Sequence, residues 1–414
     1  MEKIKVGIDA EEFGAWGGGI DFIATIAEAL EYTGNVQTYL LIAKDSIGNH
    51  ILRRASSLIK SRCDIKRYRE RLKTRLRNNK PLLEGFKICS PNTVPVFYVS
   101  SDNRLLQNDE QKKGICAIKN NIDIVLPRVE CRSSNFPVPQ IAYIFDFQHK
   151  YIPELFTEEE RQRRDRNFER QLKNAHYVMV NAADVKKDIR KFFPQYNNEI
   201  IVLPFRPFQK PNIVNVALDK YDLPQKYYMI ANQFWQHKDH LTAFEALEQT
   251  YCMGYKDIHI VCTGKMQDLR NPEYIADLER RVSELKCRDN IHLLGFIAKD
   301  DQIAIMSKAV GLIQPTWFEG GPGGGAVYNA LCLGITCLVS DIQVNREITG
   351  YENVFFFEKG NQTELSKLMI EHFSDEKIDD ETVNKKIVEN KKEYCNYIYA
   401  KIKEVIEYCH NKVN

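Results

Sequence analysis

Short apolar segments alternate with segments of helical periodicity along nearly the whole chain, and this alternation is the strongest constraint on its fold. Strands separated by helices of this length form a parallel sheet with helices on both faces. The sequence therefore predicts a doubly wound α/β protein. The expected strands are residues 3–9, 38–42, 94–99, 122–126, 140–145, 177–180, 200–203, 227–231, 258–261, 291–294, 311–314, 336–339 and 354–357.

The chain has 414 residues, which exceeds what one hydrophobic core usually covers and favours two domains. The proline-rich segment from Pro204 to Pro211 disfavours regular structure and indicates a linker. We therefore expect an N-terminal Rossmann-like domain over residues 1–207 and a second one over 208–395. We expect a C-terminal helix over 396–414, which could pack back on the N-terminal domain.

A glycine-rich loop follows the fourth strand expected in the second domain. Five glycines occupy the seven positions from Glu319 to Gly325, and an apolar helical pattern follows. Backbone amides at a helix start bind anions, and glycine lets a bulky anion approach the backbone, so the loop predicts a phosphate site. It does not match the phosphate-binding motif of nucleotide triphosphatases, and its relaxed dinucleotide fingerprint is not in the first strand–helix turn. The alternative is a turn that serves only tight packing.

The segment from Arg53 to Lys80 is strongly basic, with twelve lysines and arginines against Asp64 and Glu70. A helix here would present a narrow apolar stripe between basic flanks, so it could lie on an anionic membrane surface or be a solvated face of the first domain. We expect no nucleic-acid binding, because no known binding motif accompanies the charges.

No apolar stretch is long enough to span a bilayer, and the first residues lack the profile of a signal peptide. The 11 cysteines form no Cys-x-x-Cys pair and mostly lie in apolar runs, which indicates reduced core thiols. We therefore expect a cytoplasmic protein, with peripheral association at the inner membrane face if the basic segment binds lipid.

The second half of the chain resembles the donor half of the family 4 glycosyltransferases, which have the GT-B fold and retain anomeric configuration. The likeness rests on "ANQFWQHKDHLTAFEAL" (231–247), "NIHLLGFIAKDDQIAIMSKAVGLIQ" (290–314) and "PTWFEGGPGGGAVYNALCLGITCLVSDIQVNREI" (315–348), in that order. The first half is similar more loosely, through residues 17–20 and "IFDFQHKYIPELF" (144–156). The resemblance implies two Rossmann-like domains that face each other across a cleft.

Carried over by position, the resemblance assigns Glu319 to the hydroxyls of the donor sugar and Lys238 to the donor diphosphate. Asp146 and His149 of the first domain would face the cleft near the reacting carbon, and Trp16, Gly17, Gly18 and Gly19 would approach the diphosphate or acceptor from the opposite wall. The remaining donor-binding candidates are Gln233, His237, Gly295, Phe296, Thr316, Gly320, Gly321, Pro322, Gly323, Gly324 and Asn329. For Trp16, His149 and Phe296, plain packing in the core is the alternative interpretation.

Two positions depart from the family pattern. The arginine of its Arg-x-x-x-x-Lys diphosphate clamp is replaced by Gln233, so part of the expected positive charge is missing or comes from elsewhere, such as His237 or His240. The second acidic residue of its E-x7-E pattern has no counterpart at the standard spacing, and Asn329 takes that place only after a two-residue insertion. These departures concern the residues that would bind the donor's diphosphate and ribose.

The resemblance implies transfer of a sugar from a nucleotide diphosphate to a glycan or lipid-linked glycan, in the making of a surface polysaccharide. The chain has no Asp-x-Asp motif, so we expect transfer without a metal or other cofactor, with Lys238 and loop amides supplying the countercharge. The alternatives are a sugar-nucleotide epimerase or phosphorylase of the same fold, and a non-catalytic partner subunit that binds a nucleotide sugar without turnover.

Overall fold

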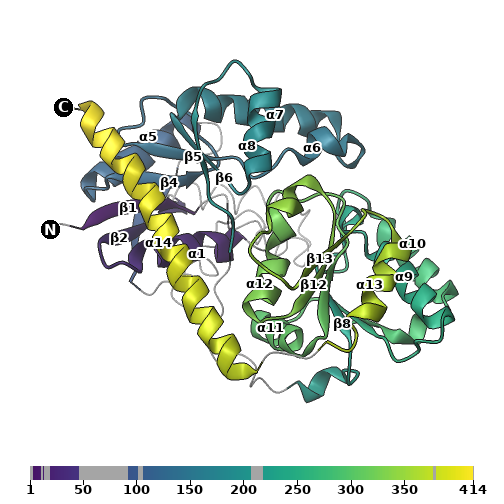
Figure 1. Ribbon diagram of the computed structural model, residues 1–414. Helices are drawn as coiled ribbons and strands as arrows, with labels where there is room; N and C mark the ends of the chain where they lie inside the picture. The colour runs from purple at the N-terminus through teal and green to yellow at the C-terminus, as the bar shows by residue number, and fades with distance from the viewer. Residues whose placement is uncertain are drawn as a thin grey trace, which may run out of the picture.

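The computed structural model (Figure 1) describes residues 3–10, 13, 19–45, 92–100, 106–206, 218–375 and 379–413. Within these residues the chain forms two parallel sheets with helices on their faces, as the alternating pattern predicts. Each expected strand overlaps an observed one, because strands buried on both faces are short continuous apolar runs. The α/β expectation with two doubly wound units is confirmed.

The N-terminal sheet has the strand order β3-β2-β1-β4-β5-β6-β7. Its strands are β1 (Ile4–Asp9), β2 (Val36–Asp45), β3 (Val94–Ser100), β4 (Ile124–Arg128), β5 (Gln140–Tyr143), β6 (Tyr177–Val180) and β7 (Glu199–Val202). The helices described around it are α1 (Gly19–Glu31), α5 (Leu106–Lys119), α6 (Gln148–Tyr151), η2 (Pro153–Leu155), α7 (Glu158–Asn174) and α8 (Ala183–Phe192).

The C-terminal sheet has the strand order β10-β9-β8-β11-β12-β13. Its strands are β8 (Tyr228–Ala231), β9 (Ile260–Thr263), β10 (Ile291–Leu293), β11 (Gly311–Gln314), β12 (Thr336–Ser340) and β13 (Val354–Phe357). Its longer helices are α9 (His240–Cys252), α10 (Tyr274–Glu284), α11 (Lys299–Lys308), α12 (Ala326–Cys332) and α13 (Gln362–Glu371). Short 3₁₀ turns are η4 (Asp219–Tyr221), η5 (Gln236–Lys238), η6 (Arg288–Asn290), η7 (Pro322–Gly325) and η8 (Gln343–Glu347).

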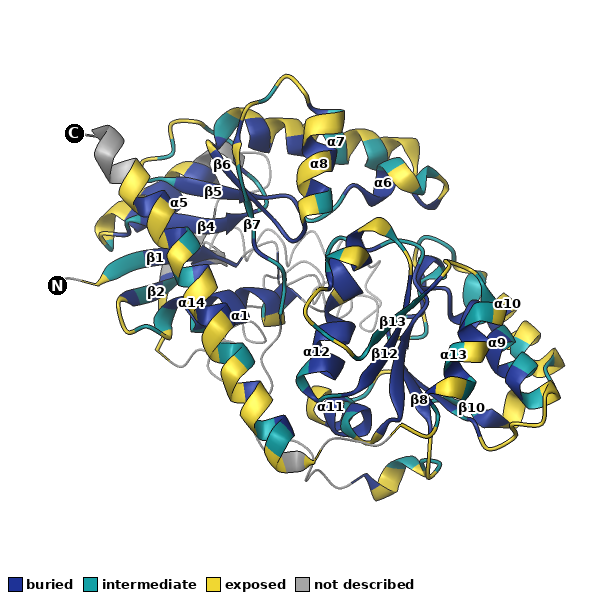
Figure 2. Cartoon of the chain, in the orientation of Figure 1, coloured by how far each residue is buried: buried dark blue, intermediate teal, exposed yellow. Residues whose placement is uncertain are grey.

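The strands of both sheets are largely buried, whereas the helices that cover them are exposed on their outer faces (Figure 2). In both sheets the strand order reverses beside the first strand, between β1 and β4 and between β8 and β11. Loops diverge at such a switch point and leave a crevice at the carboxyl ends of the strands, where ligands of open α/β sheets bind. The fold thus predicts one candidate ligand-binding crevice in each domain.

The helix α14 (Asp380–Val413), yellow in Figure 1, joins the two domains. It begins at Asp380, well before residue 396. Val383 and Ile387 of this helix belong to the C-terminal core, whereas its buried residues from Tyr394 onward pack in the core of the N-terminal domain beside α1. The domain boundary expected at 207/208 lies outside the described residues.

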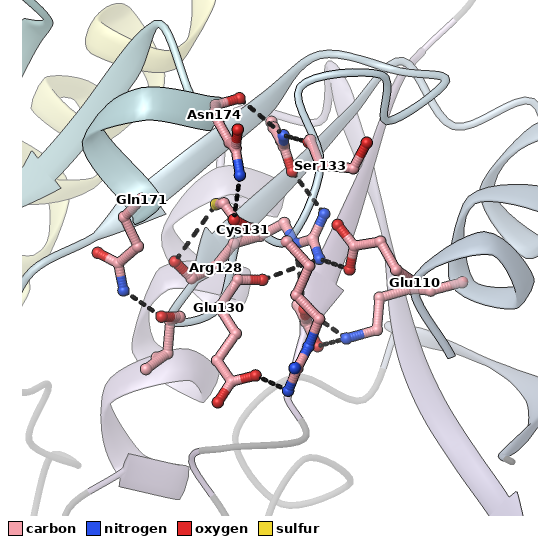
Figure 3. Close-up of polar contacts among 12 residues, drawn as sticks. Glu110, Arg128, Glu130, Cys131, Ser133, Gln171 and Asn174 are labelled. Atoms are coloured by element: carbon pink, nitrogen blue, oxygen red, sulfur yellow. Dashed lines mark hydrogen bonds and ion pairs between the residues drawn. The ribbon is translucent and has the colours of Figure 1, made fainter. Parts of the chain in front are cut away.

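A buried ionic network occupies the switch point of the N-terminal sheet (Figure 3). Arg128, at the end of β4, donates from Nη2 to Glu110 Oε2 at 2.5 Å, and its Nε lies 3.3 Å from Asp9 Oδ2 at the end of β1. Lys113 Nζ donates to both carboxylate oxygens of Asp9, at 2.9 and 2.7 Å. Gln140 accepts a further hydrogen bond from Arg128. All five side chains are buried, so their charges are compensated within the domain.

Candidate functional site

The switch point of the C-terminal sheet brings together two loops that are about 80 residues apart in sequence. Lys238 follows β8 and Glu319 follows β11, and Lys238 Nζ lies 2.5 Å from Glu319 Oε1. The side chains are 10% and 8% exposed, so the pair is nearly desolvated. The two residues that the resemblance assigned to the donor diphosphate and sugar are therefore in direct contact.

A chain of amides holds the Glu319 carboxylate in place. Gln314, the last residue of β11, donates from Nε2 to Glu319 Oε1 at 2.9 Å, and Asn232 Nδ2 donates to Gln314 Oε1 at 2.8 Å. Both amide side chains are buried. Because Asn232 directly follows β8, this chain of hydrogen bonds crosses the switch point and fixes the carboxylate relative to both strands.

The glycine loop needs glycine for its backbone shape. Gly323, Gly324 and Gly325 have φ values of +65°, +58° and +86°, a conformation that L side chains rarely adopt. A Cβ on Gly324 would lie 2.6 Å from Glu319 Oε2, and a Cβ on Gly323 would lie 2.4 Å from Val327 Cβ. The loop therefore curls back over the Glu319 carboxylate, and side chains at these positions would displace it.

The glycine loop faces the N-terminal domain. A Cβ on Gly320 would lie 2.5 Å from the carbonyl oxygen of Phe145, and a Cβ on Gly321 would lie 3.1 Å from Asn181 Cβ. Phe145 and Asn181 follow β5 and β6 of the other sheet. The predicted site thus lies at the junction of the domains, as the resemblance implies.

Several groups of the loop already have partners that shape it. The Gly323 amide donates to Asn345 Oδ1 at 2.9 Å, and the Gly324 amide donates to the Gly321 carbonyl at 3.1 Å. Thr316 Oγ1 donates to the His237 carbonyl at 3.1 Å, and the Trp317 amide donates to the same oxygen at 2.8 Å. Thr316 is thus a residue that ties the loop to the segment carrying Lys238. Pro322 and Asn329 are buried around this turn.

Two buried histidines flank Lys238. Burial, together with the nearby Lys238 and Arg270, lowers the pKa of His237 well below its usual range. Burial and Lys238 lower the pKa of His240 to about 3, and its ring stacks on Phe234 with centroids 4.1 Å apart. Both rings are therefore neutral at pH 7 and supply no countercharge beside Lys238.

Gln233 and the loop after β10 lie at the same edge of the sheet. Gln233 Oε1 accepts a hydrogen bond from the Lys265 amide at 3.0 Å, so this side chain fixes the loop that follows β9. Gly295 has φ of +69°, and its carbonyl accepts from the Gly264 amide at 2.8 Å. Phe296 is 77% exposed, which rules out the alternative of a core aromatic and leaves its ring available to a ligand.

Asp146 lies at the domain junction, beside Gly320. Its Oδ1 accepts from Arg164 Nη1 at 3.1 Å and from the Gln148 amide at 3.0 Å. Its carboxylate therefore helps to organise the loop that follows β5.

His149 does not point into the cleft as we expected. Its side chain is fully buried beside the rings of Phe147, Phe156 and Phe168, and its Nε2 lies 2.9 Å from Asp165 Oδ1. Burial lowers its pKa. The aromatic surroundings, which spacing alone does not reveal, place the ring one layer behind the domain junction.

Arg270 is a charged residue of this junction that the sequence did not single out. It lies in the loop after β9, where its Nη2 is 3.1 Å from His237 Nδ1 and its Nη1 donates to Gln148 Oε1 of the N-terminal domain at 2.9 Å. The only signal in the sequence is an arginine that follows an apolar strand by a few residues, which is common in loops.

Some predicted residues cannot be placed. Trp16, Gly17, Gly18 and the segment from Arg53 to Lys80 lie outside the described residues, and Gly19 begins α1 as a buried residue. Across the part of the chain that the structure describes, no group of three or more potential metal ligands converges. Every helix in that part is too short or too polar to cross a membrane.

Residues 220–393, which span the C-terminal sheet and the start of α14, match the family model of the glycosyl transferases group 1. No curated protein matches the sequence significantly. The family match covers most of the second domain, and the two facing Rossmann-like domains give the chain the GT-B fold.

Solved structures with this fold cover nearly the whole chain. Sucrose-phosphate synthase from Thermosynechococcus elongatus superposes with a TM-score of 0.63 at 12% identity, covering 99% of this chain and 100% of its own. A glycosyltransferase from Rickettsia africae gives 0.62 at 14%, covering 99% of both chains. HepE of Anabaena in complex with UDP gives 0.62 at 12%, covering 98% of this chain and 100% of its own. At these identities the likeness shows the fold.

Proposed function

We propose that this protein transfers a sugar from a nucleotide diphosphate sugar to a glycan or lipid-linked glycan, with retention of configuration and without a metal. The observation that carries the proposal is the buried pair of Lys238 and Glu319 under the glycine loop, at the switch point and opposite the other domain. HepE of Anabaena is bound to UDP in one crystal structure and to UDP-glucose in another, which supports a nucleotide sugar as donor.

Lys238 and Glu319 have complementary tasks in this proposal. A carboxylate accepts hydrogen bonds from two neighbouring sugar hydroxyls, and an ammonium group offsets the charge that develops on a departing diphosphate. In their direct contact each group neutralises the other in a nearly dry environment, which avoids the cost of an isolated buried charge. A bound donor would replace this contact by one contact to each residue.

In the front-side route to retention that we propose, the leaving group departs and the acceptor attacks on the same face of the sugar. The bond between the anomeric carbon and the β-phosphate oxygen breaks, the bond to the acceptor oxygen forms, and a phosphate oxygen of the leaving group takes the acceptor proton. The protein contributes fixed charges and dipoles around the diphosphate, which favour the transition state. The chain has no Asp-x-Asp motif, which supports countercharge from Lys238 in place of a metal ion.

The test measures donor binding and transfer in EDTA. Calorimetry with UDP, GDP and ADP identifies the base, the corresponding nucleotide sugars are then assayed for transfer, and NMR of the product reports anomeric configuration. We expect Lys238→Ala and Glu319→Ala each to reduce kcat by about 100-fold or more, since each removes a charge fixed at the reacting groups. Lys256→Ala, an exposed lysine of the same domain, is the matched control.

The outcomes separate the alternatives. A wild-type protein that binds a nucleoside diphosphate but transfers no sugar would favour the non-catalytic partner subunit. Full activity in Lys238→Ala, or inversion at the anomeric carbon, would overturn the corresponding part of the proposal.

Membrane association is a separate part of the proposal, and it rests on the basic segment from Arg53 to Lys80 alone. We expect the protein to sediment with vesicles of anionic phospholipid and not with neutral ones, and to be released by salt. Such binding would fit an acceptor that is attached to lipid, as in the assembly of a surface polysaccharide. Equal binding to both kinds of vesicle would contradict it.

A further inference from the structure

The loop between β9 and α10 is held tightly against the segment that carries Lys238. Gln233 accepts from the Lys265 amide, and the Phe234 amide donates to the Lys265 carbonyl at 3.2 Å. A Cβ on Gly264 would lie only 1.9 Å from the Asn232 carbonyl oxygen, so no side chain fits between the two loops there. Gln233, where the family has an arginine, thus fixes a neighbouring loop.

That loop presents Arg270 to the Lys238 segment in a defined orientation. Asp268 Oδ1 accepts from the Arg270 amide at 3.0 Å and lies 3.4 Å from Arg270 Nε, while Asp268 Oδ2 accepts from the Gln236 amide at 2.9 Å. The guanidinium also lies near the rings of Trp235, at 5.3 Å, and Phe156, at 5.5 Å. The side chain is therefore held at its base and on its faces.

The two terminal nitrogens of Arg270 contact neutral groups. Nη2 faces Nδ1 of His237, which burial keeps uncharged, and Nη1 faces the Gln148 amide oxygen. The one acidic group near Arg270 among the described residues is Asp268, which lies at Nε on the other side of the guanidinium. With 21% of the side chain exposed, the Nη edge is a cationic fork whose partners an anion can replace.

We propose that Arg270 is the second cation of the donor diphosphate site and takes over the task of the arginine that Gln233 replaces. His237, which contacts Arg270, is the chain neighbour of Lys238, so both cations flank one point of the switch crevice. The phosphate oxygens would replace Gln148 and His237 as partners of the Nη atoms. This inference rests on the proposed function, because it concerns the same donor.

The experiment compares UDP, GDP and ADP with the corresponding nucleoside monophosphates by calorimetry on the full-length protein. Arg270→Gln should weaken binding of the preferred nucleoside diphosphate by about 10- to 100-fold, the range expected for lost hydrogen bonds to a charged group, and affect the monophosphate less. The diphosphate affinity of Arg270→Lys should lie between those of the wild type and Arg270→Gln, since lysine keeps the charge but lacks the two terminal nitrogens of the guanidinium. Circular dichroism confirms that each variant is folded.

A second variant tests whether Arg270 binds the ligand or only links the two domains through its hydrogen bond to Gln148. Gln148→Ala removes the partner of Arg270 in the N-terminal domain and leaves the guanidinium in place, so diphosphate affinity should stay the same or rise. Equal losses in Gln148→Ala and Arg270→Gln would overturn the inference in favour of a link between the domains, and unchanged affinity in Arg270→Gln would overturn it outright. Failure of the proposed function looks different: the wild-type protein would then bind none of the three diphosphates.

Discussion

The two switch points of this molecule hold similar sets of charges in opposite arrangements. At the N-terminal one, Arg128 links Asp9 and Glu110 in a buried network (Figure 3). At the C-terminal one, Lys238 and Glu319 form a separate pair, and Arg270 directs its terminal nitrogens at neutral groups. Lys113 is the second cation of the N-terminal set, and Asp268 is the second anion of the C-terminal set. Each set therefore has two cations and two anions.

The difference shows that the same position in a fold can be used for stability or for binding. A guanidinium that already contacts two carboxylates gains little from a third anion, and breaking a buried pair leaves an uncompensated charge. A cation that faces neutral partners, or a single carboxylate, gives up less interaction energy when an anionic ligand replaces those partners. We therefore assign stability to the N-terminal set and donor binding to the C-terminal set.

The largest expected effect is the loss of Arg128. Arg128→Met removes the guanidinium that pairs with the buried carboxylates of Asp9 and Glu110, so the N-terminal domain should lose about 3–5 kcal/mol of its free energy of unfolding. Urea unfolding followed by circular dichroism measures this loss. The matched control is Arg132→Met, whose side chain is 24% exposed and pairs with Glu130, and which should cost less than about 1 kcal/mol. Equal losses of unfolding free energy in Arg128→Met and Arg132→Met would contradict a stabilising role for the N-terminal set.

The glycine loop gives the second prediction, because the C-terminal set depends on backbone that only glycine adopts easily. Gly324→Ala adds both a strained φ and a collision with the Glu319 carboxylate, and we expect a loss of about 1–3 kcal/mol in stability with a larger relative loss in kcat. Gly360→Ala is the control for strain alone, since its φ is +77° and nothing lies within 4 Å of an added Cβ. Thermal unfolding and transfer assays compare the two. A variant Gly324→Ala no worse than Gly360→Ala would show that the carboxylate position is not critical.

Much of the fold could be predicted because its signals are local. The strands β6, β11 and β13 have the expected bounds, and β6 and β13 are four-residue apolar runs flanked by polar residues, which leave little choice. The resemblance placed Lys238 and Glu319 at one donor site, and both follow strands that meet at one switch point, but it did not predict their direct contact.

The rest depends on contacts between distant segments. Arg270 reaches His237 and Gln148 from a loop without a motif, and the aromatic pocket around His149 comes from three separate segments of the N-terminal domain. Neither arrangement leaves a periodic pattern in the sequence. The network of Asp9 and Arg128 left only a weak signal, namely charged residues at the ends of apolar strands.

The smallest expected effect is a difference in acid stability, which follows from the neutral histidines of the C-terminal site. The folded protein lowers the pKa of His240 to about 3, so below pH 6.5 the unfolded chain binds a proton that the folded protein does not. The contribution of His240 to the free energy of unfolding is at its maximum above pH 6.5. It falls by about 1.4 kcal/mol per pH unit as the pH decreases towards 3. His240→Phe keeps the stacking on Phe234 and removes the titration, so wild type and variant should diverge by about 2 kcal/mol between pH 7.5 and pH 5 in urea unfolding.

Because His237 and His149 remain in both proteins, their contributions cancel in the comparison. Parallel stability curves would show that His240 takes up its proton in the folded protein as well, and the C-terminal site would then be no drier than the surface.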